Sequence, residues 1–202
     1  MKKLKYIVPI IIVIFVSTNA KSQDVASKLK EAQSAYSSGS LDNARFALQQ
    51  ALEEINKAIG KEILGILPVK MGDMPYVEKE DNVTGAAMGN SSLYVNRKYG
   101  TDDKNVKVEI ISDSPLLAGI NAMLAMPSFL GTGNANQKRI KIAGYKALMQ
   151  KNSDDNGKTS YDIQVPFNQS LLTVRCQGIS SENDAISMAN SIAIDKIVKL
   201  AQ

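Results

Sequence analysis

Two pairs of methionines are the residues whose types and spacing best suit a chemical role in this sequence. Met71 and Met74 lie in the segment MGDM, and Met123 and Met126 lie in MLAM. Clustered thioether sulfurs can bind Cu(I), a soft ion, outside the cytosol. Methionines also fill gaps in a core or line an adaptable binding surface. Because no histidine or cysteine lies beside either pair, packing or a binding groove is favoured, and we expect neither a metal nor a cofactor.

Other side chains for catalysis are scarce. The sequence contains no histidine, which excludes Ser-His-Asp and Cys-His systems and removes the side chain best suited to proton transfer near neutral pH. The only cysteine, Cys176, lies in the apolar pattern SLLTVRCQG and is expected to be a buried, inert thiol. Three acidic clusters lie among turn residues without the spacing of a calcium loop; they are Glu78-Glu80-Asp81, Asp102-Asp103 and Asp154-Asp155. We therefore expect that the protein is not an enzyme.

The loop GTGNANQKR, residues 131–139, contains a Gly-x-Gly pattern that could indicate a phosphate site. A dinucleotide-binding fingerprint follows a strand and opens a helix, whereas this loop follows a predicted helix and opens a predicted strand. It also lacks the third glycine of that fingerprint. The glycines are therefore expected only to turn the chain.

The N-terminus has the composition of a secretory signal peptide. Three lysines precede an apolar run over residues 6–16, and small residues end at Ala20. The run is about eleven residues long, short of the roughly 20 that a membrane-spanning helix requires. We expect residues 1–20 to be removed, which leaves no stable membrane anchor and places the mature chain in the periplasm or outside the cell.

The formal charge follows from this removal. Residues 1–20 carry three of the 24 basic residues and none of the 20 acidic ones, so the net charge falls from +4 to +1. The remaining chain has no basic run of the kind that binds a phosphate backbone, so nucleic acid is not an expected partner. Its length suits one ordinary domain with an accessory piece.

Residues 21–66 are predicted to form a helical hairpin. Apolar and small residues recur at three- and four-residue spacing on both sides of a break at residues 37–40. The recurring positions are Ala32, Ala35, Tyr36, Ala44, Leu48, Ala51, Leu52, Ile55 and Ile59. Each helix is therefore expected to have one apolar face. An isolated hairpin cannot bury such faces, so it must pack on the rest of the chain, on a second copy or on a partner.

The segment AYSSGSLDNARFALQQALEEI, residues 35–55, resembles a single tetratricopeptide repeat. Residues that match the packing and turn positions of that repeat are Ala32, Tyr36, Gly39, Ala44, Leu48, Ala51 and Leu52. The proline that usually follows the second helix is missing. The resemblance implies a hairpin that binds a peptide, and the need to bury its apolar faces predicts a protein partner or self-association through the hairpin.

Residues 67–92 are predicted to be a linker with a first short strand, and residues 93–202 an α+β sandwich domain. Beyond residue 92 the apolar period changes to two. The predicted strands are residues 93–100, 106–112, 139–144, 145–151, 160–167 and 170–178. Tight turns, such as Asn156-Gly157, favour an antiparallel, meandering sheet.

Helices are predicted to cover this sheet. One begins at Ser114 and ends before Pro127, a second begins at Ser180 or Ser181, and Asp195 could cap a short third helix. Helices on an antiparallel sheet make an α+β sandwich. The order of elements over residues 67–202 resembles the Mog1/PsbP-like group, and residues 170–201 resemble its closing strand and helix. This resemblance implies an exported protein that binds rather than catalyses.

Two functions are expected from these features. The first is a non-catalytic exported protein of the cell envelope that acts as a protein-binding or scaffold module through its hairpin. The alternative is a carrier or sensor of an apolar small molecule bound between the sheet and helix 115–126. The residues expected to line the ligand site or partner surface are Leu116, Ile120, Met123, Met126, Met71 and Met74.

Overall fold

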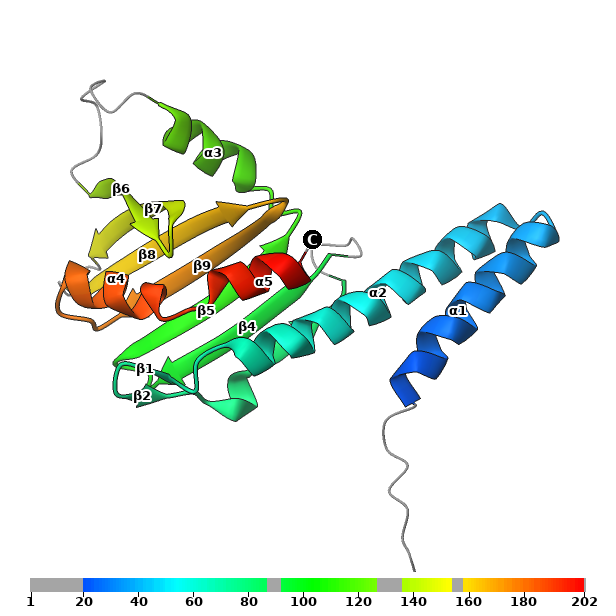
Figure 1. Cartoon of the computed structure of the whole chain (residues 1–202), viewed down its shortest axis with the longest axis horizontal. Coiled ribbons are helices and arrows are strands. Elements are labelled where there is room, and N and C mark those ends of the chain that lie inside the picture. The colour runs from blue at the N-terminus through cyan, green and yellow to red at the C-terminus, as the bar shows by residue number, and fades with distance from the viewer. Residues whose placement is uncertain (1–19, 87–91, 127–135, 154–157, 202) are drawn as a thin grey trace, which may run out of the picture.

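The computed structural model describes residues 20–86, 92–126, 136–153 and 158–201. A helical hairpin projects from one side of an antiparallel sheet that carries further helices (Figure 1). The predicted α+β class, with a hairpin followed by a helix-covered sheet, is confirmed. The signal-peptide segment, the glycine loop at 131–133 and the Asn156-Gly157 turn lie outside the described residues.

Helices α1 (Ala20–Ser37) and α2 (Leu41–Ile66) form the hairpin. Their contact is made by small side chains, because Ala32 on α1 and Ala44, Ala47 and Ala51 on α2 are buried. Alanine favours helix and lets two helix backbones approach closely. The chain reverses at Gly39, whose φ of 79° is in the left-handed region that glycine tolerates best.

The second half of α2 packs on the sheet domain. Ile63 is fully buried in the main core, and Gly60 lies against strands β3 and β4. A Cβ atom at Gly60 would lie 2.5 Å from Val83 Cγ1, so the absence of a side chain allows this close approach. The helix therefore belongs to both parts of the molecule.

Residues 67–92 contain more regular structure than the single strand predicted. A two-stranded ribbon is followed by a short 3₁₀ helix and by the edge strand of the main sheet. These elements are β1 (Lys70–Met71), β2 (Met74–Pro75), η1 (Glu78–Glu80) and β3 (Asn82–Thr84).

The six strands predicted beyond residue 92 are all present, and their ends agree with the prediction to within about two residues. They are β4 (Tyr94–Gly100), β5 (Asn105–Ser112), β6 (Gln137–Ile142), β7 (Tyr145–Ser153), β8 (Thr159–Phe167) and β9 (Ser170–Gln177). The order in the sheet is β3-β4-β5-β9-β8-β7-β6, with every pair antiparallel. Two meanders are thus joined where β5 pairs with β9.

Helices α4 (Glu182–Asn190) and α5 (Ile194–Leu200) cover the core face of the sheet together with the end of α2 (Figure 1). Ser181 caps α4, because its hydroxyl accepts a hydrogen bond from the Asp184 amide at 3.1 Å. Asp195 is not the cap of α5: Ala193 holds that position, and Asp195 lies in the first turn and accepts a hydrogen bond from the Tyr145 hydroxyl at 2.9 Å.

Helix α3 (Leu117–Ala125) lies on the opposite face of the sheet. Its buried residue Ile120 clusters with Leu148 and Leu171, which alternate along β7 and β9 with residues of the main core. The helix begins two residues later than predicted, with Leu116 rather than Ser114 at the N-cap position. Ser114 caps a preceding turn instead, where its hydroxyl accepts from the Leu116 amide at 3.4 Å.

Candidate functional site

The outer half of α2 exposes a row of large apolar side chains, here called the α2 stripe: Leu41, Leu48, Leu52 and Ile55. These side chains are between 39% and 63% exposed. Their spacing of seven, four and three residues places them within about 60° of one another around the helix axis. Three further exposed apolar side chains on the hairpin are Leu29, Tyr36 and Phe46.

The α2 stripe continues into the core of the sheet domain. Ile59 follows Ile55 by four residues and is partly buried against the core, and Ile63 follows by four more and is fully buried. One apolar row thus runs the length of α2, and the sheet domain covers only its inner end. Helix α1 packs on the neighbouring alanine face and leaves the outer end of the row exposed.

The residues beside the α2 stripe carry little net charge. Gln49 and Asn56 flank it as neutral amides, and Arg45, which lies within the row, forms an exposed ion pair with Asp42 at 3.7 Å. Exposed pairs of this kind contribute little to stability. A helix packed along the stripe would therefore contact apolar side chains and would meet no strong positive or negative electrostatic field.

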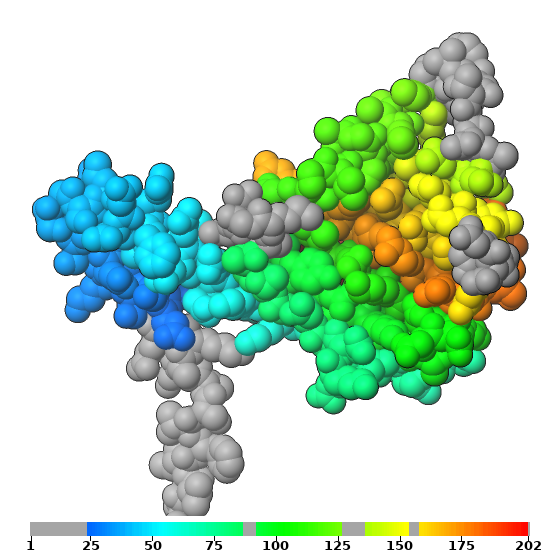
Figure 2. Space-filling view, turned by 180° about the vertical axis from the view of Figure 1, so that it is seen from behind, coloured from blue at the N-terminus to red at the C-terminus, as the bar shows by residue number. Residues whose placement is uncertain are grey.

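The residues of α3 and its ends that were predicted to line a ligand site or partner surface differ in their exposure. Ile120 is buried against the sheet, whereas Leu116, Met123 and Met126 are between 41% and 56% exposed. Seen from behind, the end of the molecule that carries α3 rises above the strands (Figure 2). Beneath α3, Ile120 clusters with Leu148 and Leu171, so these side chains occupy the contact between the helix and the sheet.

Two shallow grooves open beside that contact, with volumes of about 350 and 430 Å³. Both include Leu124 of α3 and Lys146 of β7, so the two grooves adjoin, and together they are here called the α3 groove. Its other lining residues are Asn121, Ala125, Arg139, Ile140, Lys141 and Pro166.

The other methionine pair lies in the core rather than on a surface. Met71 and Met74 face each other across the β1–β2 ribbon, and both are buried. The Met71 sulfur accepts a hydrogen bond from the Ser191 hydroxyl at 3.3 Å. The two methionine pairs therefore do not share a surface, and the geometry of Met71 and Met74 fits the packing interpretation.

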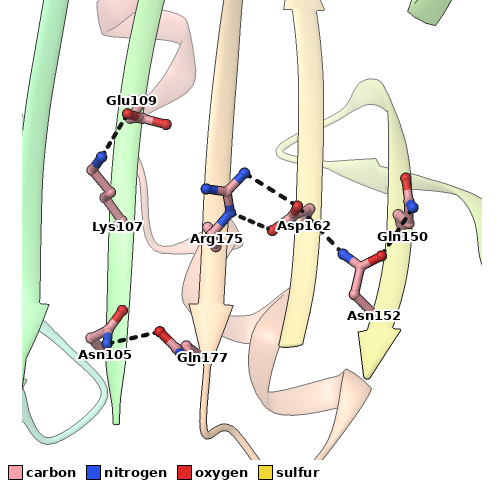
Figure 3. Close-up of polar contacts among 8 residues, drawn as sticks. All are labelled: Asn105, Lys107, Glu109, Gln150, Asn152, Asp162, Arg175 and Gln177. Carbon is pink, nitrogen blue, oxygen red and sulfur yellow. Dashed lines mark hydrogen bonds and ion pairs between the residues drawn. The ribbon is translucent and has the colours of Figure 1, made fainter. Parts of the chain in front are cut away.

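The face of the sheet away from α4 and α5 carries a ladder of polar side chains (Figure 3). Arg175 Nε donates to Asp162 Oδ1 at 2.9 Å, and Lys107 Nζ lies 2.8 Å from Glu109 Oε1. Amides continue the ladder through Asn105–Gln177 at 3.4 Å and Gln150–Asn152 at 3.0 Å. Each of these two carboxylates is held by a cation, which is the arrangement of a solvated sheet face rather than of an acid–base pair.

Glu109 illustrates the electrostatics of this face. Burial would by itself raise the pKa of Glu109, but hydrogen bonds from Lys107 and Tyr94 outweigh burial and lower the pKa below 4.5. The Tyr94 hydroxyl donates to Glu109 Oε1 at 2.9 Å, and burial together with this bond raises the pKa of Tyr94 to about 12. Both groups therefore keep their ordinary protonation states near neutral pH.

Two of the acidic residues and the cysteine singled out in the sequence lie in ion pairs or in the core. Asp81 is partly buried and pairs with Arg97, whereas Asp102 is exposed and pairs with Lys98. Burial raises the pKa of the Cys176 thiol to about 12. Among the residues that the structure describes, no three His, Cys, Asp or Glu side chains come together as a metal site. Asp154-Asp155 lie outside them.

Comparison with protein-family models, curated proteins and solved structures found no match to the chain. The resemblances to a tetratricopeptide repeat and to the Mog1/PsbP-like group therefore stay predictions. Across the described ranges, no helix is both long and apolar enough to cross a bilayer.

Proposed function

We propose that the protein is a non-catalytic, exported protein of the cell envelope that binds another polypeptide through the α2 stripe. The observation that supports this function is the exposure of Leu41, Leu48, Leu52 and Ile55 on a helix whose inner half is packed in the core. Covering each of these half-exposed side chains would contribute about 1 kcal/mol. The row of four would therefore contribute about 4 kcal/mol to the contact with a partner.

The spacing of the α2 stripe favours a helical partner. Positions three, four and seven residues apart form the seam along which two amphipathic helices pack. A second copy of the hairpin presents the same seam with neutral flanks, so self-association meets no strong charge repulsion. We therefore infer that the occupant is an amphipathic helix, supplied most simply by a second molecule of this protein.

Export and the absence of catalysis rest on the sequence. The lysine-rich, apolar N-terminus has the pattern of a signal peptide, and the chain contains no histidine. The structure adds that Asp162 and Glu109 on the open sheet face are each held by a cation. These features support binding rather than catalysis as the activity of the protein.

Sedimentation of the purified protein tests self-association. The double variant Leu48→Glu/Leu52→Glu is expected to lower the average mass at high concentration, because charges replace the apolar seam. Leu116→Glu is the matched control, since Leu116 is similarly exposed but lies next to α3, away from the hairpin. Circular dichroism confirms that each variant is folded. Equal masses for the wild type and the double variant at every concentration would contradict self-association.

The second candidate function is a carrier or sensor of an apolar small molecule near residues 115–126. It is supported by the α3 groove, where Leu124, Ala125 and Pro166 lie beside polar and cationic side chains in an open depression. Because Ile120, Leu148 and Leu171 fill the deeper contact, a ligand would lie in the groove beside the helix and not beneath it. Binding of an apolar probe that is reduced by substitutions at Ala125 tests this function.

A further inference from the structure

Three cations lie together on the sheet face that carries α3: Arg139 and Lys141 on β6, and Lys146 on β7. They alternate along their strands with Ile140 and Ala147, which belong to the core side of the sheet. Lys141 and Lys146 are direct partners across the β6–β7 pair. Like charges in this position destabilise a hairpin, so the pairing is unfavourable unless an anion lies near it.

No carboxylate among the described residues forms an ion pair with these three cations. On the opposite face of the same strand, Lys138 has such a partner, because its Nζ lies 2.7 Å from a Glu182 oxygen. The Arg139 guanidinium donates to the Met126 carbonyl at the end of α3. That bond holds Arg139 at the mouth of the α3 groove.

The rest of the groove combines apolar and polar groups. Leu124 and Lys146 belong to both of its parts, with Asn121, Ala125 and Pro166 lining one part and Arg139, Ile140 and Lys141 lining the other. The Ile140 side chain itself packs on the core side of the sheet. A groove in which Leu124, Ala125 and Pro166 lie beside convergent charged groups suits a ligand that has an apolar body and one charged end. The charge complementary to Arg139, Lys141 and Lys146 is negative.

We propose that the α3 groove binds an acyl chain that carries an anionic head. The chain lies along Leu124, Ala125 and Pro166, and the carboxylate or phosphate head contacts Lys141, Lys146 and Arg139. Lysine and arginine form strong charge-assisted hydrogen bonds with both kinds of head. This inference rests on the second candidate function and adds the chemical class of the ligand.

Two sources supply this chemistry: a free fatty acid or lysophospholipid, and the anionic lipids of a bilayer. Both present an acyl chain attached to a negative head. Binding of dissolved monomers identifies the free source, and binding to phosphatidylglycerol vesicles but not to phosphatidylcholine vesicles identifies the bilayer. Either result supports the proposal when it depends on the two lysines.

Fluorescence of a conjugated polyene fatty acid measures binding without interference, because the sequence contains no tryptophan. The purified protein is expected to bind this probe, and dodecanoate is expected to displace it. Glycerol monododecanoate, which has the same chain and a neutral head, is expected to displace it at least about tenfold less well. The preference is expected to weaken at high salt.

Matched pairs of variants distinguish the effect of charge on binding from an effect of misfolding. Lys141→Gln/Lys146→Gln is expected to weaken dodecanoate binding about tenfold, and Lys70→Gln/Lys151→Gln, which removes two exposed lysines elsewhere, is expected to have no effect. In the groove, Ala125→Glu is expected to weaken binding more than Ala125→Gln, which has nearly the same size. Ala125 is exposed, so neither change disturbs the core.

Different outcomes overturn the anionic ligand class and the second candidate function on which it rests. Equal binding of the anionic and neutral amphiphiles, unaffected by Lys141→Gln/Lys146→Gln, would overturn the anionic class but keep an apolar-ligand carrier. No binding of either amphiphile, and no binding to vesicles, would overturn both.

Discussion

Arg97 on β4 and Asp81 before β3 form a two-bonded ion pair that is largely shielded from solvent. Arg97 Nε lies 2.9 Å from Asp81 Oδ1 and Nη2 lies 2.5 Å from Oδ2. The third nitrogen, Nη1, donates to the Leu64 carbonyl at 2.9 Å, and the guanidinium lies 4.3 Å from the centroid of the Tyr76 ring. The pair therefore fastens the last turn of α2, and with it the hairpin, to the edge of the sheet.

Removal of one partner from this pair is expected to destabilise the fold. Asp81→Asn leaves the Arg97 charge buried without its counterion and is expected to lower the free energy of unfolding by about 2–3 kcal/mol. Urea denaturation measures the change. Asp102→Asn is the control, because its pair with Lys98 is exposed to solvent and is expected to have no measurable effect. Equal effects of the two substitutions would contradict the role of the Asp81–Arg97 pair.

Two glycines of α2 are expected to respond oppositely to alanine. At Gly60 an added Cβ lies 2.5 Å from Val83, whereas at Gly65 it meets no atom within 4 Å. Gly60→Ala is expected to destabilise by about 1 kcal/mol net, because crowding exceeds the gain in helix propensity. Gly65→Ala is expected to stabilise by about 0.5 kcal/mol. Denaturation curves in which both alanines stabilise would show that α2 does not pack closely on β3.

The thiol of Cys176 is expected to be unreactive in the folded protein. Burial raises its pKa from 9.0 to about 12, so about one thiol in ten thousand is ionised at pH 8, and the side chain is inaccessible. Alkylation should therefore proceed at the rate of unfolding. Ser34→Cys adds an exposed thiol on α1 as an internal control that reacts at once. Rapid modification of both thiols in native protein would contradict the burial of β9.

Glu109 is expected to contribute to acid sensitivity. Its folded pKa is lowered below 4.5, so the stability it provides is fully present above that pH and is lost as pH falls through the folded value. The wild type should therefore exceed Glu109→Gln in stability at pH 6, and this difference should shrink at pH 3. Denaturant midpoints at the two pH values measure it. A difference that grows on acidification has the wrong sign for this explanation.

Much of the fold was predictable because period and turn residues are local signals. The helices and the strands beyond residue 92 lie close to their predicted ranges, and Ser181 caps α4 as expected from its side chain. The pairing of β5 with β9 was not predictable, since more than fifty residues separate them and either meander could have formed an edge. The sequence analysis also did not predict the Arg97–Asp81 pair. Asp81 lies among turn residues, where acidic side chains are usually solvated.

The candidate sites depend on tertiary burial, which periodicity does not report. The same apolar spacing places Ile63 in the core and leaves Leu52 exposed, and the difference is set by where the sheet domain ends. Met71 and Met74 are buried, whereas Met123 and Met126 are exposed, although both pairs have the same spacing. The Lys141–Lys146 pair did have a sequence signal, because the two lysines lie symmetrically about the Ala143-Gly144 turn.

The central claim is that the α2 stripe binds a polypeptide, and site-specific photo-crosslinking in producing cells tests it most directly. A photoreactive amino acid replaces Leu52 in one variant and Leu116, a similarly exposed leucine outside the hairpin, in another. The expected result is a covalent adduct from position 52 only, at twice the mass of the chain for self-association or at another mass for a different protein. An absence of adducts from position 52, or equal labelling from both positions, would contradict the claim.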